Sequence, residues 1–250
     1  MKCIPSKFNI VEKNCHTLLK VVIHQPNYFP YSGFFHKLTL GDSLVLMDNT
    51  QYDKKFTNRN RIIVPNDWIW LSVPIKKEHK FSPNKTVEIN NEIDWKKNHF
   101  TKIQKSYSNS KFFNLYKDYL KNLYEKEWNF LFELNYETIT KVMEWLGIKL
   151  KIYKESDLNI NGKSTERLVN ICKSIGADTY ISGIGGKEYM NEKLFNSNNI
   201  NLEYQNFTHP IYEQHFSDSF IPNLSILDLL FNHGLKSLEI LKNSQNNVEN

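Results

Sequence analysis

Short apolar runs, several of them rich in β-branched residues, punctuate the first fifty residues of the chain. The run at residues 18–23 stops at a proline-containing loop, residues 24–32, and the run at residues 43–47 stops at Asp48. Residues 33–38, between the two runs, have the pattern of a short helix. A strand, a helix and a second strand in such close succession are typical of a βαβ unit, so we predict a parallel sheet.

The middle of the chain has a different pattern. Residues 62–74 contain two apolar stretches around a Pro-Asn-Asp turn, which predicts a β-hairpin, and residues 86–89 are typical of a further short strand. From residue 94 to about residue 147, apolar positions recur at helical spacing, which predicts two or three helices.

Strand and helix patterns alternate again over the last hundred residues. We predict strands at residues 150–153, 178–182 and 200–204, and helices at residues 164–175, from residue 187, and at residues 225–232. Ser164 is expected to cap its helix, because a serine hydroxyl can accept from first-turn amides. The whole pattern predicts an α/β fold, with a mostly parallel Rossmann-like sheet flanked by helices and with an inserted β-hairpin and helical segment.

Composition narrows the class of protein. The content of 40% hydrophobic and 24% charged residues is ordinary for a soluble globular protein, and no apolar run has the length of a membrane span. The N-terminus lacks the apolar segment of a signal peptide, and the three cysteines have no metal-ligand spacing. We therefore expect a cytoplasmic protein without structural zinc, with one α/β domain at residues 19–242, a helical insertion at about 94–147, and a poorly ordered extension at residues 1–18.

The charge of the chain is less informative than the scarcity of arginine. The net charge is +5, but the basic residues are spread along the sequence, so we do not expect DNA binding. Only three of the 32 basic residues are arginine, and two of these, Arg59 and Arg61, share one short stretch with Asn58. A planar guanidinium binds phosphate or carboxylate through two hydrogen bonds, so this stretch is a candidate anion site, with a solvated charged face as the alternative.

The loop after the first predicted strand carries the first candidate site. Ligands of open α/β sheets bind outside the carboxyl ends of the strands, and His24, Gln25, Asn27 and Tyr28 follow that strand directly. His24 is a candidate general base, and the alternative is a histidine satisfied by backbone groups. Asp48 ends the neighbouring strand, where it could orient His24, bind a ribose hydroxyl or hold Mg²⁺, or simply cap a turn.

A glycine-rich loop forms the other candidate site. Three of the nine glycines follow the predicted strand at residues 178–182, in the order Ser182, Gly183, Ile184, Gly185, Gly186. Missing side chains let a backbone approach an anion closely, and a following helix N-terminus would add amide donors. A flexible turn is the alternative reading. For His99, His209 and Asp228 we expect structural roles.

These stretches together resemble the WbqC-like family of bacterial proteins, from about residue 19 to residue 234. The resemblance rests on residues 24–30 with 33–37, 48–51, 58–62, 70–74, 180–186 and 224–232. It brings Lys37 and Gln51 among the candidate substrate-binding residues, and it implies surface-polysaccharide biosynthesis of the O-antigen type, with a glycine-transferase role. A similarity to HIGH-type nucleotidyltransferases is looser, because Asn27 stands where their second histidine would be.

We therefore predict a transferase that forms an amide on an amino sugar carried by a nucleotide or a lipid, with a glycyl, aminoacyl or other acyl donor. His24 would act as the base with Asp48 orienting it, Arg59 and Arg61 would bind phosphates, and residues 182–186 would hold an anion or oxyanion. Two alternatives stay open: a nucleotidyl- or adenylyltransferase that uses Mg²⁺ with a nucleotide, and a non-catalytic binding module of a polysaccharide-assembly complex.

Overall fold

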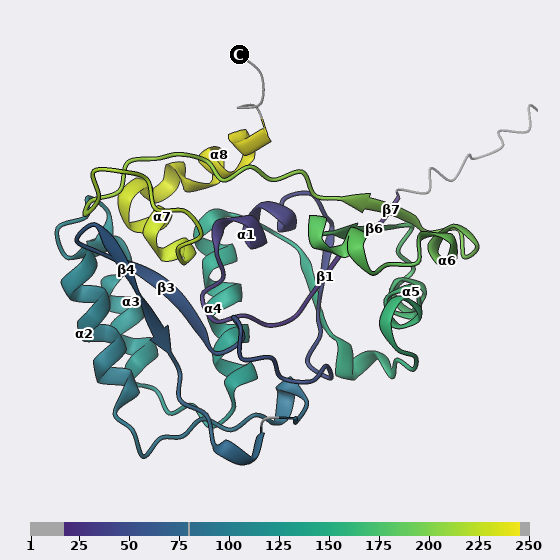
Figure 1. Ribbon diagram of the computed structural model, residues 1–250, viewed down its shortest axis with the longest axis horizontal. Coiled ribbons are helices and arrows are strands. Elements are labelled where there is room, and N and C mark those ends of the chain that lie inside the picture. Colours follow the sequence, from purple (N-terminus) through teal and green to yellow (C-terminus); the bar gives the residue numbers. More distant parts are fainter. Residues whose placement is uncertain (1–17, 80, 246–250) are drawn as a thin grey trace, which may run out of the picture.

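The central sheet has five parallel strands. A computed structural model describes residues 18–79 and 81–245 of the chain (Figure 1). The strands are β1 (Lys20–His24), β2 (Ser43–Leu46), β5 (Lys151–Lys154), β6 (Thr179–Ser182) and β7 (Asn201–Tyr204), and their order in the sheet is β5-β2-β1-β6-β7. The three inner strands are almost wholly buried, which explains their continuous apolar runs.

Alternate residues of β1 face two different hydrophobic cores. Val22 packs into the larger core, which it shares with Leu44 and the helices on one side of the sheet. Val21 and Ile23 belong to a smaller core with α5 (Ser164–Ile175) and α6 (Glu192–Asn196). Figure 1 shows these two helices on the opposite side of the sheet from α1 (Ser32–Leu38) and α7 (Ile226–His233). Burial of both faces fixes the register of the strand.

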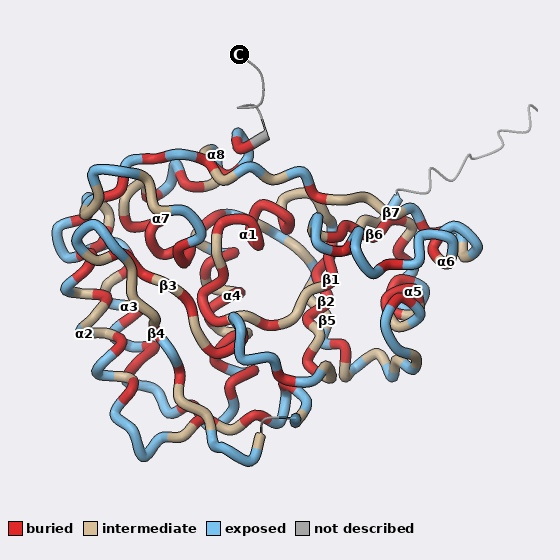
Figure 2. Tube along the Cα trace, viewed as in Figure 1, coloured by how far each residue is buried: buried red, intermediate tan, exposed pale blue. Residues whose placement is uncertain are grey.

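The second layer contains the hairpin and three long helices. Strands β3 (Arg59–Val64) and β4 (Asp67–Ser72) form a two-stranded antiparallel sheet. They are followed by α2 (Trp95–Tyr107), α3 (Phe113–Glu125) and α4 (Leu131–Leu146). The hydroxyl of Ser106 on α2 donates to the carbonyl of Ile63 at 2.6 Å, which joins this helix to the hairpin. Figure 2 shows that the buried side of each helix faces the interior.

Shorter elements complete the described chain. They are the helix α8 (Ser237–Lys242) and the 3₁₀ turns η1 (Lys77–His79), η2 (Asn84–Thr86), η3 (Glu155–Leu158), η4 (Ile184–Glu188), η5 (Gly234–Lys236) and η6 (Asn243–Gln245). None of the helices in the described ranges has both the length and the apolar composition needed to cross a bilayer.

The predicted α/β class, parallel sheet, hairpin and helical segment are confirmed, and three local predictions are wrong. Residues 86–89 form no strand, because the amide of Ile89 donates to the carbonyl of Asn129 in a loop instead. The helix expected from residue 187 is replaced by η4 and the short α6, which begins only at Glu192. Ser164 does not cap α5: it enters the helix at a φ of 47°, and no side chain caps that end. The predicted extension at residues 1–18 lies, apart from Leu18, outside the described residues.

Candidate functional site

The carboxyl ends of β1 and β6 open onto a cavity of about 440 Å³, here called the smaller cavity. Residues from both candidate loops line it: His24, Gln25, Asn27, Lys37, Ser182, Gly183, Gly185 and Gly186. Because β1 and β6 are neighbours in the sheet, the topology brings together two segments that are more than 150 residues apart in the sequence. This is the position where open α/β sheets place their ligands.

The imidazole of His24 is held in one tautomer. Its Nδ1 lies 2.8 Å from the backbone carbonyl of Gln25, which can only accept, so Nδ1 carries the proton and Nε2 has the lone pair. The ring also packs edge-on against Phe34, with centroids 4.8 Å apart. Burial, with a smaller contribution from the charge of Lys37, lowers the pKa of His24 to about 3. The imidazole is therefore uncharged at neutral pH.

Lys37 is the second nitrogen group of the smaller cavity. It lies on α1, only 5% of its surface is exposed, and its side chain lines the cavity. Within the described ranges its amine makes no hydrogen bond and no ion pair. Burial lowers the pKa of Lys37 to about 7, so a large fraction of this lysine is uncharged near neutral pH.

The glycine loop presents bare backbone on the other side of this cavity. A Cβ added to Gly183 or Gly185 would meet no atom within 4 Å, so both positions are open. A Cβ on Gly186 would collide with the Ser182 Oγ and the Met190 side chain, because the chain turns back there with a bond from the Gly186 amide to the Gly183 carbonyl at 2.9 Å. No regular α-helix begins at this loop, so the amides available to a ligand are those of a 3₁₀ turn.

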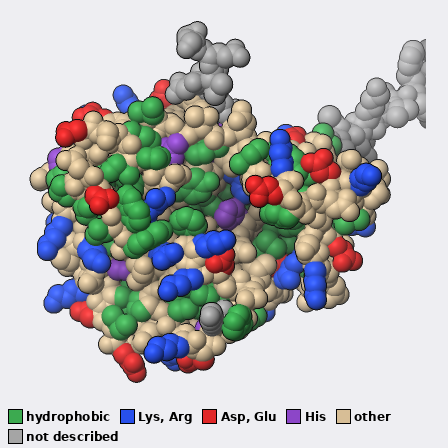
Figure 3. All heavy atoms as spheres, in the orientation of Figure 1, with side chains coloured by type: hydrophobic (Ala, Val, Ile, Leu, Met, Phe, Trp, Pro, Cys, Tyr) green, Lys and Arg blue, Asp and Glu red, His purple; other side chains and the backbone are tan. Residues whose placement is uncertain are grey.

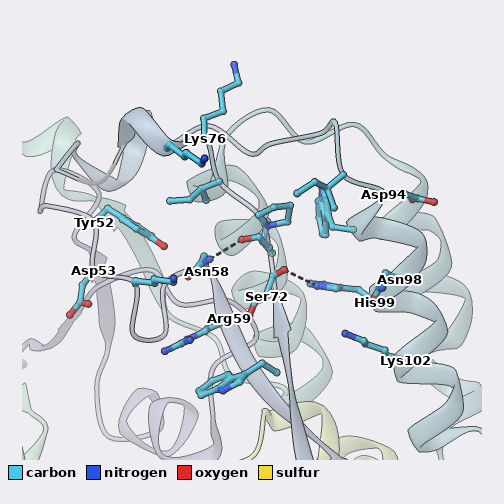
Figure 4. A pocket seen from close by; sticks show the side chains of 18 of the residues that line it. Tyr52, Asp53, Asn58, Arg59, Ser72, Lys76, Asp94, Asn98, His99 and Lys102 are labelled. Carbon is cyan, nitrogen blue, oxygen red and sulfur yellow. Dashed lines mark hydrogen bonds between the residues drawn. The ribbon is translucent and has the colours of Figure 1, made fainter.

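A larger cavity, of about 1300 Å³, lies next to the first (Figure 4). Gln51, Asn58 and Arg59 line it, whereas His24 does not. Asp53 lines both cavities, and residues 51–59, which contain it, form part of the wall of each. The candidate residues thus divide into two groups at two adjoining cavities.

Arg59 is fixed against an aromatic side chain in the larger cavity. Its guanidinium carbon lies 4.3 Å from the centroid of Trp70, and its Nε donates to the carbonyl of Lys55 at 3.0 Å. Cation–π stacking and this hydrogen bond orient the guanidinium before any ligand arrives.

Two buried polar atoms in the wall of the larger cavity lack a partner. The hydroxyl of Tyr52 and the Oδ1 of Asn58 accept or donate no hydrogen bond within the described part of the chain, although the Asn58 Nδ2 donates to Val73 at 2.8 Å. Both residues are more than nine-tenths buried, and Figure 4 shows the Tyr52 hydroxyl turned toward Asn58. Unsatisfied polar groups of this kind are rare in folded proteins and are found where a ligand or water completes the site.

The larger cavity is also electropositive. Five basic side chains line it, against two acidic ones, Asp53 and Asp94; the basic ones are Lys54, Arg59, Lys76, Lys77 and Lys102. On the face drawn in Figure 3, basic side chains gather across the middle of the molecule among apolar ones. Such a lining favours an anionic ligand.

Three predicted site residues line neither cavity. The carboxylate of Asp48 is buried and accepts from the amide and the hydroxyl of Ser156, at 2.8 and 2.6 Å. Arg61 stacks on Trp68, with its guanidinium carbon 4.8 Å from the ring centroid. Tyr28 is buried beneath the larger cavity, where its hydroxyl contacts His99 and Tyr124 at 3.1 and 2.5 Å. The contacts of these residues are structural.

Several cavity residues were not among the predicted ones. Tyr52 follows Gln51 directly, so its place in a polar stretch after a strand could have signalled it. Lys102 and His99 come from α2, which reaches the cavity only through packing against the hairpin, so no pattern near them in the sequence points there. His99 accepts from Tyr28 and donates to the carbonyl of Ser72, which gives it the structural role expected for it.

Comparison with known proteins gives two matches and one negative result. The model of the WbqC-like protein family matches residues 25–240. An uncharacterized protein of Mycobacterium tuberculosis, Rv1507c, is 30% identical over 226 residues, which cover 89% of this chain and 97% of that protein. No solved structure matches the chain.

Proposed function

The chain belongs to the WbqC-like protein family, and from this membership and the two adjoining cavities we propose that it is a transferase of surface-polysaccharide biosynthesis. Its substrate in this proposal is an amino sugar linked to a nucleotide, and its product is the sugar with its amine acylated. The observation that carries the proposal is the division of the polar residues between a small cavity with two uncharged nitrogen groups and a larger, electropositive one.

The sugar would occupy the smaller cavity. Its volume of about 440 Å³ suits a monosaccharide better than a whole nucleotide sugar, and its polar groups come from both walls. The open backbone at Gly183 and Gly185 would hold the oxyanion that forms when an amine attacks an acyl carbon. Asn27 and Gln25 would bind sugar hydroxyls.

The nucleotide would occupy the larger cavity. Arg59, pre-oriented on Trp70, is suited to bind a diphosphate, and Lys102 and Lys54 would add positive charge. The free acceptor of Asn58 would take a hydrogen bond from a base N–H or a ribose hydroxyl. Because both cavities share Asp53, one nucleotide sugar could extend from one into the other.

The donor in this proposal is an activated acyl group, with glycyl preferred, carried as an ester or a mixed anhydride. An aminoacyl-tRNA is one such ester. The sugar amine forms the new C–N bond, the bond from the acyl carbon to the carrier oxygen breaks, and the amine proton leaves with that oxygen.

A thermal-shift screen tests the proposal. The purified full chain is heated with UDP- and dTDP-linked amino sugars, ATP and AMP, each with and without Mg²⁺, because a ligand that binds only the folded state raises Tm. We expect a shift with the sugar nucleotides that does not require Mg²⁺. A Mg²⁺-dependent shift with ATP alone would instead support nucleotidyl transfer, and no shift with any of them would support the non-catalytic binding module.

A further inference from the structure

The smaller cavity holds two nitrogen groups that could receive a proton, and their surroundings differ. His24 uses Nδ1 in a bond to Gln25 and its ring is packed against Phe34. The amine of Lys37 lines the same cavity without a hydrogen bond or an ion pair within the described ranges. A buried amine without a carboxylate partner loses much of its hydration and gains nothing in return, so the fold pays stability to keep it there.

The charges that face Lys37 do not compensate its burial. The titratable groups on the walls of the smaller cavity are His24 on β1, Tyr180 on β6, Tyr189 after η4, and Asp53 and Lys55 on the loop after β2. Asp53 is the one carboxylate among these wall residues, and it lies within an ion pair with Lys55, at 3.8 Å. The amine of Lys37 is therefore available to a substrate.

His24 is poorly suited to accept the proton itself. An amino sugar enters solution largely as an ammonium ion, and a group whose pKa lies near 3 cannot take that proton at neutral pH. Its Nε2 can still accept a hydrogen bond from the substrate amine or a hydroxyl. We therefore separate the two roles that the sequence had given to one residue.

We propose that the amine of Lys37 is the general base of the reaction and that His24 positions the acceptor amine beside it. This inference rests on the proposed function. Lys37 takes one proton from the sugar ammonium, the freed lone pair forms the C–N bond, and Lys37 returns the proton to the carrier oxygen as the C–O bond breaks. No other co-reactant is needed, because the activated acyl donor supplies the leaving group.

The rival role for Lys37 is an anchor for an anion, which requires a permanently charged side chain. The two roles predict opposite results for Lys37→Arg. Arginine keeps the charge but is not deprotonated in proteins, so a base would be lost and an anchor kept. Lys37→Met removes both, and Lys121→Met, at an exposed position on α3, serves as the matched control.

The first test is independent of any activity. The full-length protein is pulsed with acetic anhydride between pH 5.5 and 10, and the labelling of Lys37 and of the reference Lys121 is read by mass spectrometry. We expect Lys37 to reach half of its final reactivity near pH 7 and at a lower pH than the reference. Labelling of Lys37 only in strong alkali, or no labelling at any pH, would overturn the proposal.

The second test uses turnover of a UDP-linked amino sugar with an activated glycyl ester. We expect Lys37→Arg and Lys37→Met to lose at least about 100-fold in kcat, with UDP-amino-sugar affinity within about threefold of the parent, since a general base contributes that much. The parent kcat should rise with pH through about 7. Retained turnover in Lys37→Arg would overturn the base role. A parent protein without turnover would instead count against the proposed function, and the labelling result would still stand on its own.

Discussion

The guanidinium of Arg59 lies 4.3 Å from the ring of Trp70, and both side chains line the larger cavity. Stacking leaves the edge of the guanidinium free for a ligand while fixing its direction. This pair is the most ordered anion-binding element of the proposed nucleotide site, and it gives the first prediction.

Replacing Arg59 with methionine should weaken UDP binding by about 10- to 100-fold, because a charge-assisted pair of hydrogen bonds is lost. Arg59→Lys should lose a large part of the same affinity, since an ammonium cannot bind in two places at once. Isothermal titration measures both, with Lys121→Met as control. Unchanged affinity in Arg59→Met would place the nucleotide elsewhere.

The second prediction concerns the loop that carries His24. Asn60 is buried, and its Nδ2 donates to the carbonyl of Phe29 at 2.6 Å, where Phe29 has an unusual φ of 38°. Asn60→Ala should lower the free energy of unfolding by about 2–3 kcal/mol, because buried backbone carbonyls lose their donor. Urea denaturation measures this, with the exposed Asn114→Ala as control. A cost below that of the control would mean that the loop is held by other contacts.

The third prediction concerns Asp228, a fully buried carboxylate that accepts from Tyr107, Tyr212 and Gln214. Burial raises its pKa to about 6, above the unfolded value of 3.8. The folded state therefore binds this proton more tightly, so the associated stability is present below pH 3.8 and is lost as pH rises through 6. Asp228→Asn should be destabilising at every pH, and by about 2 kcal/mol more at pH 4 than at pH 8. A pH-independent cost in urea denaturation would contradict the assigned titration.

The fourth prediction concerns the stability that Lys37 costs. Its pKa is lowered from 10.5 to about 7 in the folded state, so below pH 7 the full cost of burying the charge is present, and it disappears as pH rises toward 10.5. Lys37→Met should therefore be more stable than the parent at pH 7, on the order of 3 kcal/mol, with the difference shrinking by pH 9.5. A destabilised Lys37→Met would show that the lysine is held by favourable contacts and has a structural role.

The strands were predictable because buried parallel strands leave continuous apolar runs, as in β1 and β2. Local signals failed where a distant partner decided the outcome: the amide of Ile89 bonds to Asn129, so no strand forms there. The site was predicted in its parts, since His24 and residues 182–186 do meet. Asp48 shows what the sequence does not contain, because its partner is Ser156, 108 residues away.

The division into two cavities was likewise beyond the sequence. Arg59 and His24 were expected at one site, but the loop at residues 51–59 lies between their cavities. That loop and α2 approach each other only in the folded chain, so the pattern along the sequence could not separate the nucleotide position from the reacting position.

The most direct test of the central claim compares UDP with a UDP-linked amino sugar by isothermal titration. Gly185 has room for a side chain, so Gly185→Leu should fill the smaller cavity without disturbing the fold. We expect it to weaken binding of the amino-sugar nucleotide about tenfold and to leave UDP within about twofold, whereas Arg59→Met should weaken both. Equal binding of the amino-sugar nucleotide by Gly185→Leu and by the parent would contradict the claim that one substrate extends across the two cavities.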